Sequence, residues 1–175
     1  DYAKRQLDAL ATVGGGEVPF DAVLTYAHSL RLNSNSADAE SQSRRALQLA
    51  GRDPARRVKA LASLLRNLRN NLAEGLQVAD ELEAASKALG TPSIEQAWGY
   101  AMRGALLSKS NRFPESAAWH QKAVHLARQL EGKDSPAASD MMLMRGFTLL
   151  IHREGQAARD ILLEDSNIGA LQVAS

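Results

Sequence analysis

Apolar residues recur along most of the chain at intervals of three and four, the spacing that places them on one face of an α-helix. The clearest runs are Leu61, Leu64, Leu65 and Leu68, and then Leu72, Leu76, Ala79 and Leu82. No segment shows the sustained alternation of Val, Ile and Thr that would predict a β-strand. The pattern therefore predicts an all-α fold.

Gly, Pro and Asn residues interrupt the helical stretches at regular places and leave segments of about 12 to 18 residues, a length typical of helical hairpins. These interruptions predict a leading helix over 1–13, hairpins over about 18–51, 55–90, 93–131 and 136–165, and the start of a further helix over 166–175. Because the chain starts at Asp1 and its last segment has no capping element, we expect an excerpt of a larger protein. Dimerisation through one end of the helical stack is a further expectation.

One hairpin supplies a pattern that fits the others. Its small residue is followed at +3 by a Leu, at +7 by a turn residue, and at +12 and +19 by two more small residues: Gly104, Leu107, Asn111, Ser116 and Ala123. The same offsets apply from Ala27, Ser63 and Gly146, and the four starting residues are 36, 41 and 42 positions apart. Small residues let two antiparallel helices approach, and the turn residue tolerates left-handed backbone. The repeat predicts hairpins that stack and share a core.

This pattern resembles tetratricopeptide (TPR) repeats, with its best copy over 97–130, where Asn111–Ala117 stands in place of the usual Gly-Asp/Asn-Tyr turn. The longer spacing is similar to the variant in kinesin light chains and many bacterial regulators. Arg66 and Asp165 depart from the apolar residue and the Ala that are usual, so the second and fourth units are degenerate. The resemblance implies a right-handed α-solenoid of antiparallel hairpins over 1–175. A generic helical bundle or another α-solenoid is the alternative.

In TPR solenoids the first helix of each hairpin lines a concave groove, so the resemblance implies a partner-binding surface on these helices. The side chains that it nominates are His28, Arg31, Arg57, Leu64, Asn67, Leu68, Trp98, Ser108, Lys109, Phe147 and Ile151. Apolar and aromatic anchors with a charged fringe favour recognition of a peptide or a helix. For Trp98 and Phe147 a second interpretation is open, namely packing between hairpins.

The composition excludes several classes of protein. The chain is 45% hydrophobic, 23% charged and 5% aromatic, with a formal net charge of +1 and no cysteine. The absence of Cys excludes disulfide scaffolds and Cys-ligated zinc sites. No signal peptide is recognisable, and no apolar stretch is long enough to span a bilayer. We therefore expect a cytoplasmic protein without membrane insertion, and a periplasmic location stays open.

No sequence motif for nucleotide binding, hydrolysis or metal catalysis is present. The Gly14–Gly16 triplet lacks the preceding strand that a phosphate-binding loop requires. His120 and His125 are five residues apart, which places them on different faces of a helix rather than around one metal ion. The sequence therefore predicts no catalytic residue, no metal site, no cofactor and no enzymatic activity.

Charge is unevenly distributed along the chain. The segment Ser43–Arg69 contains eight basic residues and a single acid, Asp53, whereas the segment from Glu74 to Glu95 is net acidic. A basic cluster can contact nucleic acid or an acidic partner, although no aromatic residue is interleaved to stack on bases. The other interpretation is pairing with the neighbouring acidic helix, with the long Arg stems covering apolar surface.

We therefore expect a non-enzymatic TPR scaffold or sensor domain that binds a protein or peptide segment. By analogy with the longer repeat variant, it would be the regulatory part of a larger bacterial signalling protein, such as a transcription activator or a Ser/Thr kinase. The alternative is nucleic-acid or acidic-partner binding through the basic cluster Arg44–Arg69.

Overall fold

The computed structural model describes residues 5, 18–68 and 71–152, and every regular element in this part of the chain is an α-helix. This confirms the all-α prediction. Apart from residue 5, the predicted leading helix over 1–13 lies outside the described residues, as do residues 153–165 of the fourth hairpin and the helix over 166–175. The chain divides into two compact units, residues 1–90 and 91–175, each of which has its own packing.

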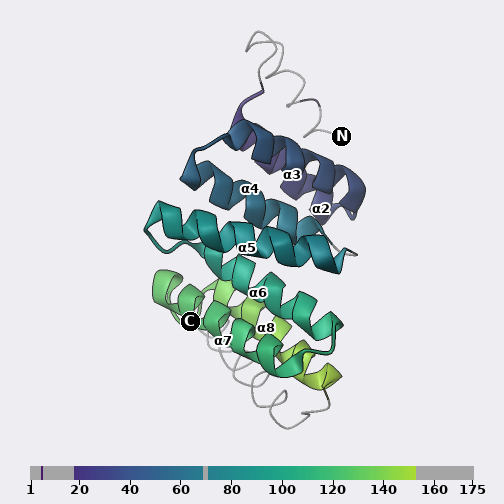
Figure 1. Cartoon of the computed structure of the whole chain (residues 1–175), viewed down its shortest axis with the longest axis vertical. Helices are drawn as coiled ribbons and strands as arrows, with labels where there is room; N and C mark the ends of the chain where they lie inside the picture. Colours follow the sequence, from purple (N-terminus) through teal and green to yellow (C-terminus); the bar gives the residue numbers. More distant parts are fainter. Residues whose placement is uncertain (1–4, 6–17, 69–70, 153–175) are drawn as a thin grey trace, which may run out of the picture. The chain divides into compact units, whose positions relative to one another are not determined.

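The first unit contains four helices that pack in the order of the sequence (Figure 1). They are α2 (Phe20–Leu32), α3 (Ser36–Ala50), α4 (Pro54–Asn67) and α5 (Leu72–Leu89). Each helix contacts the next, and α2 also contacts α4. Within the core, Val23, Ala46 and Ala60 belong to one buried cluster. The first helices of the two hairpins, α2 and α4, are therefore neighbours.

The second unit has the same arrangement with three described helices. They are α6 (Ile94–Lys109), α7 (Phe113–Glu131) and α8 (Pro136–Ile151). Here α6 packs on α7, α7 on α8, and α6 also contacts α8. Its core is built from small and flexible residues, including Ala97, Ala101, Ala123 and Met141.

Side-chain caps explain where most of these helices begin. Asn35 and Asn71 each accept a hydrogen bond from a backbone N–H three residues later, and their amide groups bond in return to Asp38 and Glu74. The first bond satisfies a backbone N–H that a helix start would otherwise leave open, and the second fixes the side chain of the cap. The caps of the other capped helices are Asp53, Ser93 and Ser135.

The turns inside two hairpins have the same backbone geometry. Ser34 and Asn111, both at +7 in the repeat, have φ of 60°. In both turns the next residue donates its N–H to the carbonyl at +3, Asn35 to Leu30 at 2.9 Å and Arg112 to Leu107 at 3.0 Å. A left-handed residue followed by this bond is the Schellman closure of a helix. The expectation of left-handed backbone at +7 is thus confirmed for these two hairpins, and Asn70 lies outside the described residues.

Small residues occupy the places where paired helices approach. Ala27, Ala39 and Ala46 are fully buried. In the second unit, the hydroxyl of Ser116 donates to the carbonyl oxygen of Gly104 across the hairpin at 2.7 Å. A Cβ on Gly104 would lie only 2.9 Å from the ring of His120. These positions therefore hold small side chains for steric reasons.

One position of the repeat carries a buried polar contact to the following hairpin in both units. Ser43 and His120 each lie four residues after the small residue at +12. The hydroxyl of Ser43 is 2.8 Å from that of Ser63 in α4, and Nε2 of His120 is 3.0 Å from the hydroxyl of Thr148 in α8. These equivalences support an internal repeat. The TPR assignment and the right-handed solenoid stay predictions.

We expect Gly104→Ala to lower the free energy of unfolding by about 1–3 kcal/mol, because the added methyl group overpacks against His120. In a His120→Ala background the same substitution should be neutral or stabilising by up to about 1 kcal/mol, since Ala favours helix over Gly. Urea denaturation of the four variants measures both effects. An equal penalty in the two backgrounds would show that His120 is not the cause.

Candidate functional site

The nominated residues of α2 and the start of α4 lie at or near the surface. His28 is exposed, and its Nδ1 lies 3.4 Å from a guanidinium nitrogen of Arg31. Partial burial, followed by the charges of Arg31 and Arg66, lowers the pKa of His28. Arg57 is half-buried, forms an ion pair with Glu81 at 3.6 Å and donates to the carbonyl of Gly51 at 3.3 Å. Arg57 is thus engaged within the unit.

The other three nominated residues of the first unit are buried. Leu64 belongs to the interior, where its side chain is only 2% exposed. Asn67 and Leu68, at the end of α4, are 3% and 5% exposed. Burial of Leu64 assigns it to packing, whereas Asn67 and Leu68 border an open hollow.

The nominated residues of the second unit fall into two groups. Trp98 is half-buried and packs against the core of α6, α7 and α8, and Ser108 is buried. Lys109 is exposed, and Phe147 and Ile151 on α8 are 60% and 67% exposed. The packing interpretation therefore applies to Trp98. The ring of Phe147 instead lies at the surface of the described part of the second unit.

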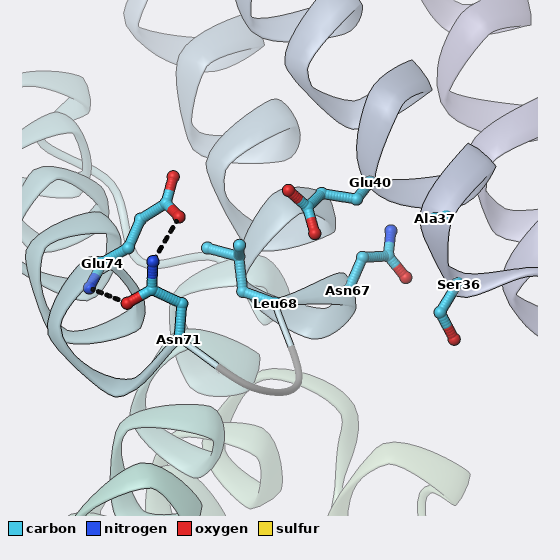
Figure 2. A pocket seen from close by; sticks show the side chains of 7 residues that line it. All are labelled: Ser36, Ala37, Glu40, Asn67, Leu68, Asn71 and Glu74. Atoms are coloured by element: carbon cyan, nitrogen blue, oxygen red, sulfur yellow. Dashed lines mark hydrogen bonds between the residues drawn. The ribbon is translucent and has the colours of Figure 1, made fainter.

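A pocket of about 670 Å³ lies between the two hairpins of the first unit (Figure 2). We call it the Asn67 pocket. Its lining residues come from the start of α3, the end of α4 and the start of α5: Ser36, Ala37, Glu40, Asn67, Leu68, Asn71 and Glu74. Figure 2 shows Glu40 and Leu68 converging across the space, with Asn67 extending toward α3. The volume is in the range of small-ligand sites in proteins.

Local helix chemistry places these groups together. Because Asn35 and Asn71 start α3 and α5 after short connections, the first turns of both helices lie beside the end of α4. Glu74 then lies in the first turn of α5 and Glu40 in the second turn of α3, and both line the pocket. Asn71 is held by two bonds to Glu74, one to its backbone N–H at 3.2 Å and one to its carboxylate at 3.1 Å. These two bonds orient the Asn71 side chain on this side of the pocket.

Asn67 is the most deeply buried polar residue of the lining. Its amide nitrogen donates to the hydroxyl of Ser43 at 3.0 Å and to the carbonyl of Ala39 at 3.4 Å. Its amide oxygen Oδ1 is buried and has no hydrogen-bond partner among the described residues. A buried acceptor without a partner costs about 1–3 kcal/mol. Such a group is expected where a ligand or water supplies the missing donor.

Arg44 connects the two carboxylates of the pocket. Its guanidinium lies 2.7 Å from Glu40 and 2.6 Å from Glu74, which joins α3 to α5. The hydrogen bonds to Glu40 and to Glu74 raise the pKa of Arg44. One positive charge is thus shared between two negative ones.

Several members of the basic cluster Arg44–Arg69 pair with acids in the same unit. Besides Arg44 and Arg57, Arg56 lies 3.6 Å from Asp53 and 5.5 Å from the centre of the Phe20 ring. Arg69 lies outside the described residues. These contacts agree with the interpretation of intramolecular pairing, since the acids of α5 supply two of the partners.

Neither His120 nor His125 belongs to a metal-binding group. Among the described residues, no three His, Asp or Glu side chains lie close enough to hold a metal ion. His120 is fully buried between helices, and His125 is exposed on the same helix. Because the Thr148 hydroxyl donates to the carbonyl of Met144 at 3.1 Å, it accepts from Nε2–H of His120, which leaves Nδ1 without a partner. His120 is a core residue.

Sequence reasoning identified two of the seven lining residues, Asn67 and Leu68, and missed the others. The missed Asn71 and Glu74 form a capping pair that can be recognised in the sequence. Recognition of that pair would have located the start of α5. It would not have shown that Glu40, more than thirty residues earlier in the chain, faces the same space.

The remaining observations concern membranes and relatives. Within the described residues, no helix combines the length and the apolar character needed to cross a lipid bilayer. Comparison with protein-family models and with curated proteins finds no match. The function is therefore argued from the geometry of the chain itself.

We expect the stability of the fold to fall between pH 6.5 and 4 because of His120. Burial, with a smaller contribution from Arg145, lowers the pKa of His120 to about 4 from 6.5. The unfolded chain takes up the proton below pH 6.5, whereas the folded chain does not until about pH 4, so acid favours unfolding. The full loss is roughly 3 kcal/mol.

Denaturation at a series of pH values, compared among variants, tests this expectation. His120→Gln should flatten the dependence between these pH values, because Gln does not titrate. His125→Gln, on the exposed side of the same helix, is the matched control and should keep the slope of the wild type. An unchanged slope in His120→Gln would contradict the assignment.

Proposed function

We propose that this chain is a non-enzymatic protein-binding scaffold of the TPR type, and that the Asn67 pocket holds a segment of a partner polypeptide. The observation that carries the proposal is a pocket open to solvent between consecutive hairpins, lined by the partly exposed carboxylates of Glu40 and Glu74 and by the buried Asn67. A peptide backbone supplies N–H donors at regular intervals, and each is suited to a carboxylate oxygen of this lining.

The mixed lining also supports a polypeptide ligand. Leu68 and Ala37 offer apolar atoms, while Glu40 and Glu74 offer carboxylate oxygen atoms. Sites that recognise extended segments combine apolar contact for affinity with a few oriented polar groups for specificity. The pocket lies between consecutive hairpins, so the repeat itself creates it.

The finer features of the architecture belong to the same proposal. Contacts between alternate helices, α2 with α4 and α6 with α8, favour stacked hairpins, and the right-handed TPR-like solenoid that the resemblance implies is proposed with them. By analogy with the longer repeat variant, the scaffold would be the regulatory part of a cytoplasmic bacterial signalling protein. The ion pairs of Arg44, Arg56 and Arg57 argue against the alternative in which the basic cluster binds nucleic acid.

A blocking substitution tests the pocket. Random-sequence peptides displayed on phage are selected on the wild-type chain, and the affinities of the selected peptides are then measured by fluorescence anisotropy. Ala37 lines the pocket and is exposed, so Ala37→Phe should fill the space without disturbing the core. We expect it to weaken binding by about tenfold or more, which corresponds to about 1.4 kcal/mol.

The matched control is Gln48→Phe, at an exposed position of the same helix remote from the lining. It should leave the affinity of the selected peptides unchanged. If Ala37→Phe and Gln48→Phe have equal effects, the pocket is not the binding site. Binding of a DNA or RNA oligonucleotide that weakens steeply with salt would instead favour the basic cluster.

A further inference from the structure

We infer that the Asn67 pocket selects a positively charged side chain, that of lysine or arginine, in the partner segment. This inference rests on the proposed function, which it makes more specific. It follows from three properties of the lining: its free hydrogen-bonding groups, its charge and its apolar atoms.

The amide nitrogens of both asparagines in the lining already donate. Asn67 donates to Ser43 and Ala39, and Asn71 donates to the carboxylate of Glu74. The oxygen atoms are not all used in this way. Oδ1 of Asn67 has no partner, and among the described residues Oε2 of Glu40 accepts no hydrogen bond, since Arg44 bonds only to Oε1. The free carboxylate oxygen of Glu40 therefore favours a ligand that donates.

The charge of the pocket also favours a positively charged ligand. Two carboxylates, Glu40 and Glu74, line it, and one guanidinium, that of Arg44, bridges them. One negative charge is left without a counterion in this group. The side chains of Glu40 and Glu74 are only about one-third exposed, so each carries little bound water. A charged group that enters the pocket therefore has little water to displace from them. An anionic ligand would meet repulsion here, whereas a cation restores neutrality.

The shape fits a long side chain with a charged end. Leu68 and Ala37 contribute apolar atoms to the lining, which the methylene stem of Lys or Arg can contact. The volume of about 670 Å³ exceeds one side chain and leaves space for the neighbouring backbone. A guanidinium carries five donors in a planar fork, which suits a partly exposed carboxylate such as that of Glu40. A metal ion is less suited, because calcium takes six to eight oxygen ligands.

An isosteric pair of peptides tests the inference. The first is an acetylated and amidated pentapeptide of four glycines with a central arginine. The second has citrulline at the centre, which keeps the shape but has no charge. Both are titrated into the ¹⁵N-labelled full chain, and the side-chain amide signals of Asn67 and Asn71 are followed by NMR. We expect the arginine peptide to bind about tenfold more tightly than the citrulline peptide.

Two variants locate the effect. Glu40→Gln removes one carboxylate while Arg44 keeps its bond to Glu74, and it should abolish most of the preference for arginine. Glu131→Gln, at an exposed position of the second unit, is the matched control and should keep the preference.

The outcomes separate this inference from the proposed function. Equal binding of the two peptides, or tighter binding of a peptide with central aspartate, overturns the charge selection. The pocket itself still stands in that case if Ala37→Phe weakens the peptides selected on phage. Shifts produced equally well by calcium or magnesium ions alone would replace the organic cation by a metal. If no peptide shifts the amide signals and Ala37→Phe has no effect on the phage-selected peptides, both proposals fail.

Discussion

Close approach of the two helices within each hairpin is the constraint on which the other contacts depend. Large side chains at the crossing would hold the helices apart, so the chain places Ala39, Ala46 and Ser116 there, all fully buried. Gly104 shows how strict the limit is, because a Cβ would touch the ring of His120 at 2.9 Å. The small residues bring backbone groups within reach of side chains, as in the bond from Ser116 to the carbonyl of Gly104.

This packing brings polar groups into the interior at one position of the repeat. Ser43 and His120 both face the first helix of the next hairpin, where they meet hydroxyl groups. The side chains at this position differ in size, because the first unit has the small hydroxyl of Ser43 and the second has the imidazole of His120. Each leaves an unpaired atom nearby, Oδ1 of Asn67 beside Ser43 and Nδ1 of His120 itself. In the first unit the residue that carries this atom lines a pocket, so the contact between hairpins lies beside a candidate binding site.

Electrostatics organise the same region. The concentration of arginine between residues 43 and 69 is balanced by acids of the first unit, with Arg44 bonded across to Glu74 and Arg57 to Glu81. These pairs are partly exposed, so each contributes little to stability. Their effect is on the orientation of the carboxylates. Arg44 bonds to one oxygen of each pocket carboxylate, so the other oxygen of Glu40 is left available to a ligand, whereas that of Glu74 accepts from Asn71.

Local rules determined much of the fold. Apolar spacing of three and four predicted helices, and the offset of +7 from each small residue located the left-handed turns at Ser34 and Asn111. Both features depend on neighbours in sequence, so the sequence is sufficient for them. The groove residues were less predictable. Position in the repeat nominated Leu64 and Trp98, but burial depends on which helices cover a side chain, and both contribute to packing.

Only the tertiary structure decided which residues form the candidate site. Glu40, Asn67 and Glu74 come from three helices, and they lie together because α3, α4 and α5 pack in succession. The orphaned oxygen of Asn67 likewise depends on the contact of its amide nitrogen with Ser43, twenty-four residues away. Helix, turn and cap are set by interactions over a few residues, and the sequence determined them. A pocket and its charge are set by side chains that meet across helices, and their meeting depends on the packing of the whole unit.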